Sequence, residues 1–208
     1  MIQNQSMVSL GFTEEMVPTG THMCLIFSNE SERVDSLLKF LLSGIQGGER
    51  IACFTDKLSE VELRAFFEEN GISYDERNAK NAIVLSGTSD VYFLDGRFDP
   101  DRMLKTLTSY YTESKDMGFT ASRVIGEMTP RIETVPGGDR LLEYESRVTM
   151  LLRDHPATAI CQYDANAFDG ATIMDVLKVH PKMIVNGAVI NNPFFVEPEI
   201  YLAQRLCQ

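Results

Sequence analysis

The stretch GTHMCLIFSNESERVDSLLKFLLSGIQGGERIACFT, residues 20–55, decides the fold. Residues 22–27 form a short apolar run, which is typical of a buried parallel strand. Asn29 is expected to cap a helix, with Glu32 as its capping-box partner. The helix has apolar residues at helical spacing, and a glycine pair ends it before a second apolar strand at 50–55. The stretch therefore predicts a right-handed strand–helix–strand unit.

The turn after the first strand reads SNESE, residues 28–32. In a nucleoside triphosphatase built on this unit, that turn would carry the P-loop, G-x-x-x-x-G-K-[ST], whose backbone amides and lysine hold the phosphates. Here it has no glycine and no lysine, and Glu30 and Glu32 place negative charge at the helix N-terminus. We therefore expect neither binding nor hydrolysis of ATP in the P-loop manner.

Length and charge exclude several classes of function. A chain of 208 residues is expected to form one main domain with a substantial core. Its net charge of −11, without basic clusters, argues against direct contact with nucleic acid or an anionic membrane. There is no apolar run long enough to span a membrane and no basic N-terminal signal. Four cysteines without a disulfide-scaffold spacing indicate reduced thiols and a cytoplasmic location.

Strands and helices alternate through the rest of the sequence, which predicts an α/β domain of three layers around a mainly parallel sheet. Residues 1–19 are expected to be an N-terminal arm, and residues 20–208 a single domain. A type I′ hairpin at Asn186-Gly187 should form a small antiparallel margin, and residues 91–94 are expected to add a short extra strand. The five core strands should begin near His22, Arg50, Ala82, Ser122 and Ala157.

Six short pieces of the sequence, taken in order and spacing, resemble a known family. They are THMC at 21–24, GER at 48–50, GEM at 126–128, LEYE at 142–145, ICQYD at 160–164 and HP at 180–181. Together they resemble the MEDS domain, the sensory domain of methanogens and methylotrophs named from the dichloromethane-responsive repressor DcmR. The resemblance runs from about residue 20 to residue 195.

The resemblance implies a RecA-like core, related to KaiC-type ATPases, that has lost its P-loop and senses small, hydrocarbon-derived compounds. The namesake repressor joins this domain to a helix-turn-helix DNA reader, for which this chain leaves no residues. DNA binding is therefore not carried over. A stand-alone sensor of this kind is expected to signal through a downstream regulatory protein or through formation of a homo-oligomer.

A ligand pocket is expected at the carboxyl ends of the first, fourth and fifth core strands, where ligands bind in open parallel sheets. Its predicted lining is His22, Cys24, Asn29, Glu30, Glu127 and Tyr163. His22 lies at the start of its strand, so it enters chiefly through the resemblance. For His22 and Cys24 the alternative is a pair of core residues, and for Glu127 a cap or salt-bridge partner of the following loop.

No catalytic residue and no cofactor are predicted. A zinc or iron site is disfavoured because no second pair of residues has metal-ligand spacing. The sequence favours a sensory module that binds a small organic ligand without turnover. Two alternatives stay open: an enzyme, either an irregular nucleotide hydrolase or a thiol- or metal-dependent catalyst, and a pure protein-interaction module.

Overall fold

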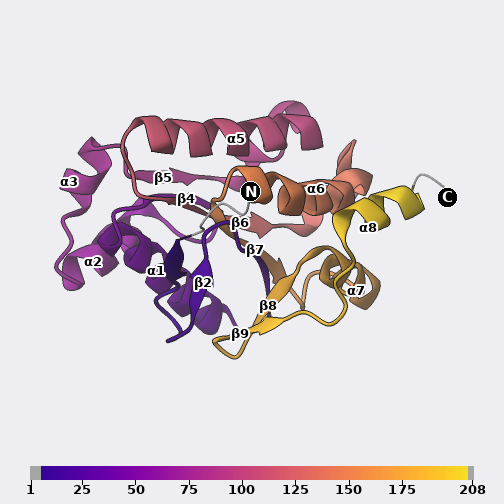
Figure 1. Cartoon of the computed structure of the whole chain (residues 1–208), viewed down its shortest axis with the longest axis horizontal. Coiled ribbons are helices and arrows are strands. Elements are labelled where there is room, and N and C mark those ends of the chain that lie inside the picture. The colour runs from indigo at the N-terminus through magenta and orange to yellow at the C-terminus, as the bar shows by residue number, and fades with distance from the viewer. Residues whose placement is uncertain (1–5, 206–208) are drawn as a thin grey trace.

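A seven-stranded sheet forms the centre of the computed structural model, which describes residues 6–205 (Figure 1). The strand order is β5-β4-β6-β7-β3-β8-β9, and only the last pair is antiparallel. The predicted α/β class and the sharing of one sheet by the five core strands are confirmed. The strands are β3 (His22–Phe27), β4 (Arg50–Phe54), β5 (Ile83–Ser86), β6 (Ser122–Met128), β7 (Thr158–Asp164), β8 (Lys182–Val185) and β9 (Ala188–Asn191).

Helices cover both faces of this sheet, so that side chains alternating along each strand enter two separate cores. In β3, Met23 and Leu25 face α1, whereas Cys24 faces the side of α5, α6 and α7. Within residues 6–205, no helix has the length and apolar character needed to cross a membrane. The helices are α1 (Glu30–Gln46), α2 (Glu60–Glu69), α3 (Tyr74–Ala79), α4 (Thr88–Val91), α5 (Pro100–Asp116), α6 (Leu141–Asp154), α7 (Gly170–Val179) and α8 (Pro198–Arg205).

Two local predictions are confirmed and two are wrong. Asn29 caps α1, and Asn186 and Gly187 have φ of 49° and 75°, as a type I′ turn requires. Among the described hydrogen bonds Glu32 does not close a capping box, because the Asn29 side chain accepts from Ser31 instead. Residues 91–94 are not a strand, because Val91 ends α4 and Leu94 begins a 3₁₀ turn (Leu94–Gly96). Between them, Tyr92 and Phe93 are buried in the core on the α5 and α6 side of the sheet.

Part of the predicted N-terminal arm packs on the domain. Its strands β1 (Met7–Ser9) and β2 (Met16–Pro18) form an antiparallel hairpin. Leu10 and Val17 are buried in the core beside α1, and Ser43 donates a hydrogen bond to the Ser9 carbonyl at 2.7 Å. Residues 1–5 of the arm and residues 206–208 lie outside the described part of the chain.

A buried ion pair joins the neighbouring strands β4 and β6 to α1. Arg123, on β6, is fully buried and pairs with Glu49, which precedes β4. The guanidinium also donates to the Phe40 carbonyl at 2.7 Å and lies 4.5 Å from the centre of the Phe40 ring. A Cβ at Gly44 would lie 2.5 Å from Arg123 Nε, so glycine is required where α1 passes this side chain.

Replacing Arg123 by alanine should destabilise the fold by about 3–5 kcal/mol, because Glu49 would keep a buried charge without its partner. Lys39→Ala is the matched control, since it removes only an exposed ion pair with Asp35 on the surface of α1. The free energy of unfolding in urea measures both. A loss no larger for Arg123→Ala than for Lys39→Ala would contradict this role.

Candidate functional site

The carboxyl ends of the central strands carry a network of opposite charges. Glu127, at the end of β6, accepts a hydrogen bond from Thr55, just past β4. The Lys57 Nζ lies 3.3 Å from Glu127, 3.6 Å from Glu30 and 3.7 Å from Asp164. One lysine thus bridges carboxylates that follow three different strands.

Arg33, in the first turn of α1, extends beneath the helix to the sheet. Its guanidinium is fully buried, donates to Gln162 Oε1 at 3.0 Å and pairs with Glu30. Partial burial pushes the pKa of Glu30 upward, but Arg33 and Lys57 outweigh it and hold that pKa below its ordinary value. Arg33 and Lys57 are therefore already paired with carboxylates of the chain, and an incoming phosphate would have to compete with them.

A second polar cluster lies on the other face of the sheet, beneath α6 and α7. Its centre is Glu145 of α6, which is fully buried. Glu145 Oε1 accepts from the Tyr163 hydroxyl at 2.6 Å, and Oε2 lies 3.4 Å from Cys161 Sγ. Oε2 also lies 3.4 Å from His22 Nε2 and 3.6 Å from His180 Nε2. Three segments of the chain, namely β3, β7 and the end of α7, thus supply titratable groups to one carboxylate of α6.

Burial sets the protonation of this cluster, which we call the Glu145 cluster: Glu145, His22, Cys161, Tyr163 and His180. Burial, with help from His180, lowers the pKa of His22 to about 4, so its imidazole is neutral at neutral pH. Burial and the Glu145 charge raise the pKa of Cys161 and Tyr163 well above their ordinary values. The thiol and phenol therefore stay protonated and donate to Glu145.

Two cavities lie near this cluster. The smaller, of about 260 Å³, opens at the amino end of β3. Its lining includes His22, Thr149, Arg153, Phe195 and Glu197. His22 thus lies both in the Glu145 cluster and in the wall of this cavity, which is open to the surface.

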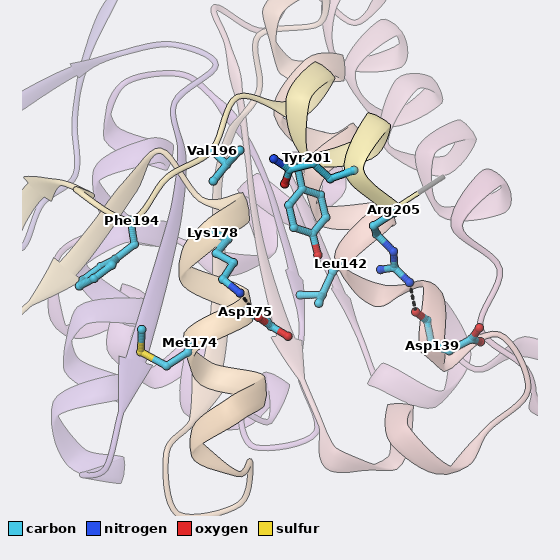
Figure 2. Close-up of a pocket in the computed structure, with 10 residues that line it drawn as sticks. Asp139, Leu142, Met174, Asp175, Lys178, Phe194, Val196, Tyr201 and Arg205 are labelled. Carbon is cyan, nitrogen blue, oxygen red and sulfur yellow. Dashed lines mark hydrogen bonds and ion pairs between the residues drawn. The ribbon is translucent and has the colours of Figure 1, made fainter. Parts of the chain in front are cut away.

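The larger cavity, of about 560 Å³, lies between α7 and α8 (Figure 2). Figure 2 shows Met174 and Lys178 projecting from α7 and Tyr201 from α8. Arg205 closes one end by donating to the Asp139 carbonyl at 3.1 Å. Its walls are therefore apolar and charged in mixture, and α8 forms one of them.

The six residues expected to form one pocket are divided between the two faces. Asn29 and Glu30 are exposed at the carboxyl edge, where Glu127 is buried beside them on the α1 side. His22, Cys24 and Tyr163 are buried on the α6 side. The expectation that all six residues line one pocket is therefore wrong. Glu127 pairs in register with Gln162, not with Tyr163, so the side chains of Glu127 and Tyr163 point to opposite faces of the sheet.

Sequence reasoning did not name Glu145, Cys161, His180, Lys57 or Arg33 as site residues. The sequence did contain one signal for Glu145. This residue lies on the same face of α6, at helical spacing, as the buried apolar residues Leu141, Val148 and Leu152. A glutamate on the apolar stripe of a helix indicates a buried charge that needs partners. The metal expectation rested on spacing along the sequence, whereas the donors here come from four separate segments.

The sequence was compared with models of known protein families to establish the family of this chain. The sequence model of MEDS, the MEthanogen/methylotroph, DcmR Sensory domain, matches residues 21–181. The chain belongs to the MEDS family. A search of curated proteins finds no match.

Solved structures confirm the RecA/KaiC-like fold of this MEDS domain. The KaiC-like protein PH0186 from Pyrococcus horikoshii is 16% identical with a TM-score of 0.59, over 87% of this chain and 80% of that one. The flagellar accessory protein FlaH from Methanocaldococcus jannaschii is 11% identical with a TM-score of 0.62, over 89% and 84%. At such identity the likeness shows the fold alone.

Tyr163→Phe should lower the free energy of unfolding by about 1.5–3 kcal/mol, because it removes a hydrogen bond to a buried carboxylate. Tyr144→Phe is the matched control: Tyr144 is buried on the same side of the sheet, and its hydroxyl makes no hydrogen bond within residues 6–205. Urea unfolding of both variants gives the comparison. Equal losses would show that the Tyr163 hydroxyl does not stabilise Glu145.

Proposed function

We propose that this MEDS domain is a cytoplasmic sensory module that binds a small organic ligand derived from a hydrocarbon and signals through a partner protein, without hydrolysing ATP. The observation that carries the proposal is the Glu145 cluster beside an open cavity. A buried carboxylate with two imidazoles and a thiol is costly to place in a core, and such perturbed groups concentrate at functional sites. Every member of the cluster lies within the region matched by the family.

The proposed lack of ATP hydrolysis is supported by the carboxyl edge of the sheet. The turn before α1 has neither the glycines nor the lysine of a P-loop. In addition, Arg33 and Lys57 are committed to Glu30, Glu127, Asp164 and Gln162. A nucleotide brought to this turn would have to displace these carboxylates from Arg33 and Lys57.

The smaller cavity is the proposed ligand site. His22, a member of the Glu145 cluster, lines it. In contrast, the described lining of the larger cavity includes no member of that cluster. A volume of about 260 Å³ suits a compact ligand, and Pro181 and Phe195 supply apolar contacts beside the polar Thr149.

The proposed signal passes through the segment that leads to α8. Phe195 and Glu197 form part of the cavity rim, and Arg153 pairs with Glu197 at 2.9 Å and with Glu199 at 2.6 Å. A ligand that displaces these contacts would shift α8, on which Ile200 is 54% exposed. An exposed apolar side chain on a movable helix suits recognition by a partner or by a second copy of the chain.

Calorimetric titration with Mg-ATP should give no saturable binding at micromolar nucleotide, because the phosphate-binding groups are absent or already paired. Lys57→Ala should not create binding, since it removes a cation and leaves Glu127 and Asp164 without their ion pair. Saturable binding to the parent that disappears on mutation of residues 28–32 would contradict the proposal and favour a nucleotide enzyme.

A thermal-stability screen of small alcohols, amines, acids and halogenated alkanes should find a stabilising ligand, because binding to the native state raises the melting temperature. Phe195→Ala should weaken its affinity by about tenfold, the equivalent of about 1.4 kcal/mol of lost apolar contact. The neighbouring Phe194→Ala is the matched control, since Phe194 lines only the larger cavity. The reverse pattern would move the ligand to the larger cavity, and no stabilising ligand at all would favour an interaction module.

A further inference from the structure

Four potential metal-ligand atoms converge within the Glu145 cluster. They are His22 Nε2, Glu145 Oε2, Cys161 Sγ and His180 Nε2, all within 4.8 Å of one another and all on buried residues. Ligand atoms 2.0–2.3 Å from an ion at the centre of a tetrahedron lie roughly 3.3–3.8 Å apart. Four of the six separations are given by contacts of 3.4, 3.4, 3.4 and 3.6 Å, which fall in that range. The other two are no longer than 4.8 Å, so a small inward movement of His180 would complete a coordination shell.

Hydrogen bonds at Nδ1 orient both imidazoles so that Nε2 faces the centre of the four ligand atoms. His180 Nδ1 lies 2.9 Å from the Val176 carbonyl, which can only accept, so Nδ1 carries the hydrogen. His22 Nδ1 lies 2.8 Å from Thr149 Oγ1, and that hydroxyl has the Val179 carbonyl at 3.2 Å as the acceptor for its own hydrogen. Each ring thus has an outward hydrogen-bond partner on Nδ1, which leaves Nε2 to face inward, as in metal-binding histidines.

Hydrogen bonding within the cluster does not satisfy these atoms. His180 Nε2 is buried and has no hydrogen-bond partner within residues 6–205. The single thiol hydrogen of Cys161 faces both Glu145 Oε2 and His22 Nε2 at 3.4 Å and can serve only one of them. Two ring nitrogens, a sulfur and a carboxylate thus converge in a dry interior, an arrangement that a central cation would stabilise.

We propose that His22, Glu145, Cys161 and His180 bind one divalent transition-metal ion, with zinc as the expected ion. Nitrogen, sulfur and oxygen donors in tetrahedral spacing match zinc, and exclude magnesium or calcium, which take oxygen ligands. Binding releases the thiol proton of Cys161 to solvent and leaves a thiolate on the metal. Tyr163 then holds the second carboxylate oxygen of Glu145 and fixes its orientation.

The metal site does not depend on the proposed sensory function, because it can be measured without any organic ligand. It adds one consequence to that function. His22 reaches both the metal position and the smaller cavity, so a ligand in the cavity would lie beside the ion. Failure of the ligand screen would leave the metal result intact, and the reverse also holds.

The test uses the full chain, purified from cells grown with added zinc. Elemental analysis should find about one zinc ion per chain. Titration of the chelator-treated protein with Co²⁺ alone should produce a thiolate-to-cobalt charge-transfer band and the visible bands of a tetrahedral site. Cys161→Ala should abolish the charge-transfer band, and His180→Gln should lower metal content at least tenfold.

The controls carry the same substitutions elsewhere. Cys53→Ala changes a buried cysteine on the opposite face, and His155→Gln changes a histidine at the end of α6. Both should keep the ion and the charge-transfer band, and circular dichroism should show that all four variants are folded. A parent chain with neither zinc nor a cobalt band overturns the site whatever the variants do. So does a band that survives Cys161→Ala, or one that both controls lose.

Discussion

The carboxylate of Glu145 is the constraint on which the α6 face of the sheet depends. It is fully buried, and β3, β7 and the end of α7 each direct a polar side chain at it. A core built only for stability would place an apolar side chain there, since breaking such a polar cluster costs more than forming it gains. The cluster also fixes how α6 and α7 lie on the sheet, because His22 and Thr149 join β3 to α6 and His180 joins the end of α7 to them.

On the opposite, α1 side of the sheet, charged side chains gather at the carboxyl ends of the strands. In a RecA-like sheet the carboxyl ends of the strands, together with the N-terminus of α1, would form a phosphate site. Here Arg33 and Lys57 pair with the carboxylates that gather at this edge. The network holds the turn before α1 in place from within the chain.

The sequence predicted most of the fold and little of the site, for physical reasons. Apolar runs and local capping depend on neighbouring residues, so the five strands, the Asn29 cap and the Asn186-Gly187 turn were readable. Which face a strand residue meets depends on register between distant strands. Glu127 and Tyr163 were therefore wrongly placed together, although each ends a core strand. Glu145 and His180 become neighbours only after α6 and α7 pack on the sheet.

The central claim is that Glu145 gathers two imidazoles whose Nε2 atoms meet at one point, because each Nδ1 is hydrogen-bonded on the outer side. Nitrogen-15 NMR of the side-chain imidazoles, recorded at neutral pH on protein purified with its metal, tests this most directly. We expect His22 and His180 to carry hydrogen on Nδ1 only, with both Nε2 resonances shifted by coordination. Hydrogen on Nε2 of either ring, or a doubly protonated imidazolium, would contradict the account.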